Sequence, residues 1–175
     1  MTPPAVLRNM DGCDGEGLRC IYTNLDTFNN KRPELEARIA DLKPDIIGLT
    51  EVKRTNATWE LANHVISLDG YTLNSNLEGR GSALYVHEKL ESAEVKMSLD
   101  VESTVWCRIS LKYRDSLLVV VVDLSPNSSE QQNGRLNKII GDVMYADYSH
   151  VLIMGDSNYP EIIWEMQISY TCAGH

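Results

Sequence analysis

Four polar side chains follow apolar segments of the chain at the points where those segments end: Asn24, Glu51, Asp156 and Asn158. Carboxylate oxygens are the ligands that Mg²⁺ prefers, and this ion completes its shell with water and substrate phosphate. Neutral carboxamides can donate hydrogen bonds to a phosphate without repelling it, while the carboxylates hold the ion and orient water. If the segments are neighbouring strands, these residue types predict a Mg²⁺ and phosphate site at one edge of the fold.

The same residues also fit a purely structural interpretation. A single Glu51 followed by Lys53 and Arg54 is common in solvated loops. The stretch Gly155-Asp156-Ser157-Asn158 contains only residue types that favour turns. Spacing alone leaves both interpretations open.

The first half of the chain has a strand, helix, strand pattern that would position two of these residues. Residues 18–23 form an apolar run that predicts a strand ending at Asn24. A helix should follow with Pro33 in its first turn and end at Lys43, because the residue before Pro44 is pushed out of the helical region. One face of this helix carries Leu35, Ile39 and Leu42, and residues 45–50 form a buried strand that delivers Glu51.

The second half favours hairpins, one helix and a last strand. Residues 71–74 and 82–86 flank a glycine-bearing connection, and residues 105–112 and 117–122 flank a second turn at residues 113–116. Ser129 and Gln132 have capping-box spacing, and Leu136, Ile139, Ile140 and Val143 line one helix face. Residues 151–154 form the strand that leads into Asp156. Hairpins mixed with crossover helices predict an α/β (α+β) fold with two stacked sheets and helices outside.

Composition limits the class of protein. The 175 residues suit one domain, which we place at residues 18–175 after a disordered leader at residues 1–17. The net charge of -9 argues against a broad basic face for nucleic acid, so phosphate contacts should be local or bridged by a cation.

The four cysteines have no CxxC pair, and no signal segment or membrane-spanning run is present in the sequence. These features predict an intracellular protein, cytoplasmic or nuclear. We expect it neither to be secreted nor to bind a membrane.

Several stretches together resemble the endonuclease/exonuclease/phosphatase superfamily, and within it the endonuclease domains of non-LTR (LINE-type) retrotransposons. In chain order they are Ile21-Tyr22-Thr23-Asn24, residues 43–53 (KPDIIGLTEVK), residues 79–86 (GRGSALYV), residues 125–129 (SPNSS) and residues 150–161 (HVLIMGDSNYPE). The likeness runs from about Leu18 to Trp164.

The resemblance implies a four-layered α/β sandwich that hydrolyses DNA phosphodiesters with Mg²⁺ (or Mn²⁺), often ahead of a reverse transcriptase domain. Glu51 matches the family's metal ligand, and Asn24 an asparagine that arranges metal and phosphate. Asp156 matches the aspartate that positions or activates the attacking water. Asn158 and Asn127 match positions expected to bind the substrate phosphate.

Three departures from the family pattern support a second hypothesis. Ser157 stands where the family usually has Phe, and Asp123 where it commonly has Tyr. The sequence ends at His175, before the family's later strands and their Ser-Asp-His, so we expect an incomplete domain, inactive by itself, with residues 117–122 exposed. The alternative to a Mg²⁺-dependent endonuclease is therefore a non-catalytic truncated retroelement relic, at most a binding module. A third hypothesis is a phosphatase of phosphoinositides or sphingolipids. The sequence argues against it, because it shows no amphipathic segment that could face lipid.

Overall fold

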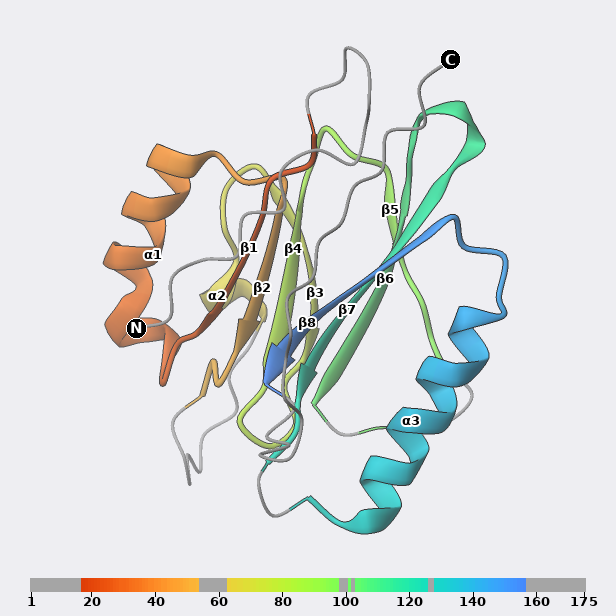
Figure 1. Ribbon diagram of the computed structural model, residues 1–175. Coiled ribbons are helices and arrows are strands. Elements are labelled where there is room, and N and C mark those ends of the chain that lie inside the picture. The colour runs from red at the N-terminus through yellow and green to blue at the C-terminus, as the bar shows by residue number, and fades with distance from the viewer. Residues whose placement is uncertain (1–16, 54–62, 98–100, 102, 126–127, 157–175) are drawn as a thin grey trace, which may run out of the picture.

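The computed structural model describes residues 17–53, 63–97, 101, 103–125 and 128–156 (Figure 1). Their elements, in chain order, are β1 (Cys20–Asn24), α1 (Phe28–Leu42), β2 (Ile46–Thr50), α2 (Asn63–Ile66), β3 (Tyr71–Asn76), β4 (Ser82–His87), β5 (Ser92–Glu94), β6 (Thr104–Ser110), the 3-10 turn η1 (Lys112–Arg114), β7 (Ser116–Asp123), α3 (Glu130–Met144) and β8 (His150–Asp156). The leader expected at residues 1–17 lies outside the described residues except for Gly17.

The strands form two four-stranded mixed sheets. Sheet A has the order β1-β2-β4-β3 and sheet B the order β5-β6-β7-β8. In each sheet one parallel pair is joined by a crossover helix: β1 and β2 through α1, and β7 and β8 through α3. The remaining pairs are antiparallel, and they include both hairpins that the sequence predicts.

Three hydrophobic clusters hold four layers together, in the order α1, sheet A, sheet B, α3 (Figure 1). α1 covers sheet A through Phe28 and Leu35, which contact a cluster that includes Ile47. A second cluster fills the space between the sheets, and a third joins sheet B to α3 through Leu136 and Ile139. The α/β class and the four-layered sandwich predicted from the sequence are confirmed.

The start of α1 was predicted wrongly. The helix begins at Phe28 rather than at Pro33, which lies inside it. Phe28 is fully buried and its backbone N–H donates to the Val52 carbonyl, at 2.9 Å. This tertiary anchor extends the helix ahead of Pro33, which cannot donate the usual backbone hydrogen bond. The end is as predicted, with Lys43 in the left-handed conformation (φ 46°) before Pro44.

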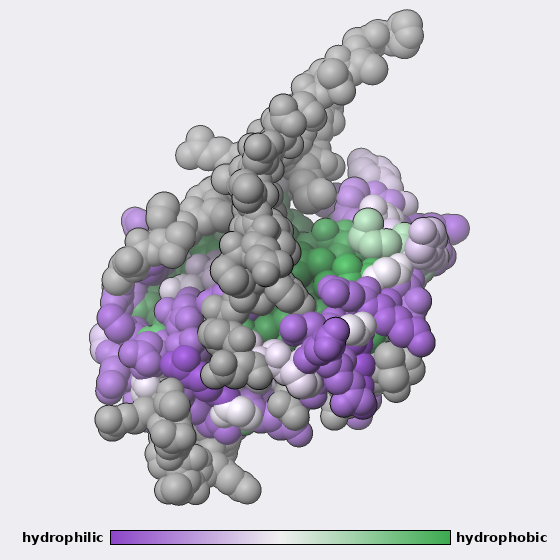
Figure 2. Space-filling model, turned by 60° about the horizontal axis from the view of Figure 1, so that its bottom comes forward, coloured by the Kyte–Doolittle hydropathy of each residue, from purple (hydrophilic) through white to green (hydrophobic). Residues whose placement is uncertain are grey.

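The expected exposure of residues 117–122 was also wrong. All six residues are at most 3% exposed, because alternate side chains enter the clusters on the two faces of sheet B. β8 is the edge strand of sheet B and pairs only with β7 among the described residues. Its Ile153 is 46% exposed. Figure 2, which brings the lower end of the molecule forward, shows a hydrophobic area between largely hydrophilic surfaces.

The capping signal of α3 is half confirmed. The Ser129 hydroxyl accepts a hydrogen bond from the Gln132 N–H, at 3.2 Å. The reciprocal bond of a capping box is not made within the described residues, since the Gln132 side-chain oxygen there is buried without a partner. Among those residues, no helix is long and apolar enough to cross a membrane.

Candidate active site

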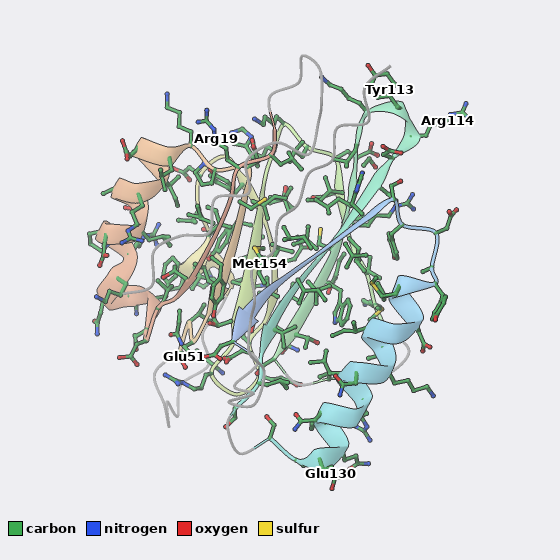
Figure 3. The ribbon with its side chains drawn as sticks, in the orientation of Figure 1. Arg19, Glu51, Tyr113, Arg114, Glu130 and Met154 are labelled. Atoms are coloured by element: carbon green, nitrogen blue, oxygen red, sulfur yellow. The ribbon has the colours of Figure 1, made fainter. Side chains whose placement is uncertain are left out.

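The carboxyl ends of four strands meet at one edge of the molecule. β1 runs parallel to β2, β7 runs parallel to β8, and all four end at the lower edge in Figure 1. Figure 3 shows Glu51 at this edge, just beyond the end of β2, and Tyr113 and Arg114 at the opposite end of sheet B. Loops at the carboxyl ends of strands are the usual place for ligands in α/β folds.

Side chains from both sheets turn toward each other at this edge. Along β7 and β8, Val121 and Met154 belong to the cluster between the sheets, so alternation places Asp123 and Asp156 on the same inner face. Asp123 and Asp156 are also directly paired in the register. On the facing sheet, the Tyr22 hydroxyl hydrogen-bonds the Thr50 hydroxyl at 2.9 Å. Burial raises the pKa of Tyr22 to about 12, and the nearby Asp156, Asp123 and Glu51 carboxylates contribute to the rise.

Glu51 has a strained backbone that is fixed on both sides. Its φ is 55°, in the left-handed region that favours glycine. Its carbonyl accepts from the Thr27 N–H at 3.0 Å, and the next two residues pair with the turn before β4, through Val52 N–H to Gly81 and Lys53 N–H to Arg80. Strain of this kind costs about 1–3 kcal/mol and persists where surrounding contacts enforce it, frequently at functional sites.

Glu51, Asp123 and Asp156 form what we call the carboxylate cluster. Burial raises the pKa of Asp123 to about 6, and the Glu51 and Asp156 carboxylates contribute to the rise. The Arg80 guanidinium and a hydrogen bond from the Glu51 backbone N–H act in the opposite direction. At Asp123, burial and the neighbouring carboxylates therefore outweigh the Arg80 guanidinium and the Glu51 N–H.

Arg80 is the cation that faces this cluster. One guanidinium nitrogen forms an ion pair with the Glu51 carboxylate, whose side chain is 15% exposed. Another donates to Asp26 at 3.3 Å, and the Asp26 side chain is 85% exposed. Gly79 and Gly81, with φ of 56° and 79°, shape the turn that presents Arg80. The guanidinium thus lies between the β1–α1 loop and the end of β2.

Gly155 is required where β8 passes β7. Its φ is 140°, and a Cβ at this position would lie 1.9 Å from the Val122 carbonyl oxygen. Only glycine fits such an approach. It therefore sets the position of the following Asp156, whose backbone carbonyl accepts from the Leu124 N–H at 2.9 Å.

The described residues bring together part of the predicted site. Glu51 and Asp156 lie at the same edge, and Asn24 ends the neighbouring strand, paired in register with Thr50. The Asn24 carboxamide oxygen accepts from the Asp26 N–H at 3.2 Å. Asn127, Asn158 and Ser157 lie outside the described residues.

Two residues of this edge were not proposed as site residues from the sequence. Asp123 was noted only as a departure from the family pattern, although its place at the end of an apolar strand was a usable signal. Arg80 carries no local signal, because its partners are distant in sequence. Within the described ranges, no three carboxylate, histidine or cysteine side chains are grouped so that they could hold a metal ion between them.

Solved structures with this arrangement of elements include several enzymes. The endonuclease domain of TRAS1, a telomere-specific non-LTR retrotransposon, superimposes with a TM-score of 0.57 at 18% identity over 81% of this chain. A 3' phosphatase, NExo from Neisseria, bound to a product DNA hairpin, gives 0.54 at 16% identity over 81%. An endonuclease/exonuclease/phosphatase family protein from Bacteroides thetaiotaomicron gives 0.51 at 13% over 76%. The chain has the endonuclease/exonuclease/phosphatase fold.

The chain spans less than two thirds of the length of each of these three proteins. It covers 59% of the TRAS1 domain, 58% of the Neisseria phosphatase and 56% of the Bacteroides protein. The sequence matches no protein family profile and no curated protein.

Proposed function

We propose that this chain carries the first part of a Mg²⁺-dependent DNA endonuclease domain, of the kind that accompanies a reverse transcriptase in non-LTR retrotransposons. The observation that supports it most is the convergence of Glu51 and Asp156 from different sheets at one edge of the fold. The resemblance of the sequence assigns these two positions to metal binding and water activation. The TRAS1 domain, whose fold this chain shares, is an endonuclease.

Among the described residues, the three carboxylates of the cluster are not grouped so that all of them could hold one ion, but each offers oxygens of the type that a hard divalent cation prefers. Burial raises the pKa of Asp123 to about 6, and the Glu51 and Asp156 carboxylates add to the rise. Mg²⁺ commonly uses one or two carboxylates and keeps several waters, so Glu51 and one of the two aspartates would suffice. A bound Mg²⁺ would supply positive charge next to the scissile phosphate. Mn²⁺ fits the same oxygen ligands.

The remaining groups have roles in phosphodiester hydrolysis that follow from their chemistry. The Asp156 carboxylate accepts a hydrogen bond from the attacking water and orients it toward phosphorus. The Asn24 carboxamide would donate to a phosphate oxygen, and Asn127 and Asn158 would do the same. Fixed donors aimed at the oxygens where charge gathers stabilise the transition state more than the ground state.

Nicking of supercoiled plasmid DNA in Mg²⁺ tests the proposal, using the protein from the full open reading frame that contains this chain. Wild type should nick, while Glu51→Gln and Asp156→Asn should lower the rate by about a hundredfold or more. Asp147→Asn, an exposed loop carboxylate, is the matched control and should keep full activity. Equal nicking by all four proteins would overturn the assignment.

A non-catalytic relic that acts at most as a binding module is the second candidate. The ion pair between Arg80 and Glu51 favours this candidate, because the guanidinium occupies a carboxylate oxygen that a cation would need. Calorimetric titration with Mg²⁺ separates the two candidates. An endonuclease should bind Mg²⁺ in a way that depends on Glu51 and Asp156, whereas a relic should give the same heats with and without these carboxylates.

A further inference from the structure

The contacts of Arg80 are unusual for a purely structural arginine. Its guanidinium bridges two carboxylates from different segments, Asp26 and Glu51, yet its side chain is 36% exposed. The Nε–H is buried and has no hydrogen-bond partner among the described residues. An arginine has five N–H donors in a fixed fork that matches carboxylate and phosphate groups. Part of that fork is therefore unused next to the cluster.

The partner of Arg80 is also the residue proposed to bind the cation. The ion pair joins a guanidinium that is 36% exposed to a Glu51 carboxylate that is 15% exposed, so water reaches it mainly from the Arg80 side. A divalent cation on the Glu51 carboxylate would compete for the same oxygens and repel the guanidinium. The second contact, to the 85% exposed Asp26, is open to water and weak. Arg80 can thus leave Glu51 when another cation takes its place on that carboxylate.

We propose that Arg80 is a substrate-phosphate ligand that Glu51 holds in place until a divalent cation binds. When the cation takes the Glu51 carboxylate, the guanidinium exchanges this carboxylate for a non-bridging phosphate oxygen of DNA. The cation replaces the guanidinium as the positive partner of Glu51, and the phosphate replaces Glu51 as the negative partner of the guanidinium. The inference rests on the proposed function, and it names the group that would hold the phosphate in a chain whose net charge is -9.

Two measurements on Arg80→Gln test the exchange: Mg²⁺ affinity by calorimetry, and binding of a short phosphorothioate DNA duplex in Mg²⁺ by anisotropy over a KCl series. Removing the competing guanidinium should tighten Mg²⁺ binding by about threefold. Losing one phosphate contact should reduce the slope of log affinity against log salt by about 0.9. Arg114→Gln, at the opposite end of sheet B in Figure 3, is the matched control and should change neither quantity.

Arg80→Lys keeps one charge without the fork and serves as the second variant if Arg80→Gln folds poorly. It should keep the salt slope of wild type and still bind Mg²⁺ more tightly. Unchanged or weaker Mg²⁺ binding in both variants, or an unchanged salt slope in Arg80→Gln, would overturn the proposal.

Measuring Mg²⁺ binding to Glu51→Gln as well distinguishes a failure of the Arg80 exchange from a failure of the proposed function. If wild type and Glu51→Gln bind Mg²⁺ equally, the metal site itself is refuted, and the exchange with it. If Mg²⁺ binding depends on Glu51 but is indifferent to Arg80, only the exchange is refuted.

Discussion

At the scale of single residues, Asp123 links the charge of the site to the stability of the fold. Its folded pKa of about 6 lies above the ordinary value of 3.8, so the folded state holds the proton more tightly than the unfolded state. The contribution of Asp123 to the free energy of unfolding is therefore highest below about pH 4 and falls as the pH rises toward 6. Above that window the ionised carboxylate destabilises the fold.

Asp123→Asn should accordingly stabilise the metal-free protein at pH 7.5. The rise of the Asp123 pKa from 3.8 to about 6 corresponds to about 3 kcal/mol, and partial exposure reduces the expected gain to about 1 kcal/mol. Urea unfolding in EDTA at pH 7.5 and pH 4 measures it, and the gain should largely disappear at pH 4. Asp147→Asn is the control; a gain at pH 4 as large as at pH 7.5 would contradict the electrostatic cause.

From the residue pattern alone, the sequence predicted candidate site residues only where apolar strands end. Glu51 and Asp156 were predicted as candidates because each stands where such a strand ends. The Arg80–Glu51 pair could not be found, because it depends on positive φ at Glu51, Gly79 and Gly81, which no residue pattern specifies for a glutamate. Partnerships made across loops depend on the assembled fold.

At the scale of elements, replacing two glycines in consecutive elements should change the free energy of unfolding in opposite directions. Gly155→Ala in β8 would place a Cβ against the Val122 carbonyl at a φ of 140°, so it should destabilise the fold by about 3 kcal/mol or unpair β8. Gly134→Ala in α3 meets open space and should stabilise by about 0.5–1 kcal/mol. Urea unfolding of both variants measures the difference. Similar effects would show that β8 is not held against β7 as described.

Elements with strong local signals were predicted well, and those that depend on tertiary contacts were not. α3 has both a cap at Ser129 and an apolar face, and it was found with its N-terminus in place. α1 starts early because Phe28 is anchored by Val52, a residue in another segment. β5, Ser92–Glu94, is only three residues long and was not predicted, and it is held in place by antiparallel pairing with β6.

At the scale of the whole molecule, each sheet has one parallel pair of strands and two antiparallel pairs. The two parallel pairs end at the same edge of the molecule. The cluster between the sheets fixes their relative position, and alternation along β7 and β8 then directs Asp123 and Asp156 toward sheet A. The carboxylate cluster is thus assembled from parts of the chain that meet only in the folded state. Repulsion among its carboxylates therefore lowers the free energy of unfolding of the whole molecule.

A divalent cation should therefore raise the stability of the whole molecule. Binding to the folded state alone stabilises it by RT ln(1 + [L]/Kd), about 2.7 kcal/mol when Mg²⁺ is at 100 times its Kd. Thermal unfolding should show a Tm that rises with Mg²⁺ at constant ionic strength in wild type, and much less in Glu51→Gln. Asp123→Asn should start from a higher Tm in EDTA and gain less from Mg²⁺, because part of the repulsion that the cation relieves is already gone. A Tm that rises equally in all three proteins would mean that the cation acts elsewhere on the surface, and the link between cluster charge and global stability would fail.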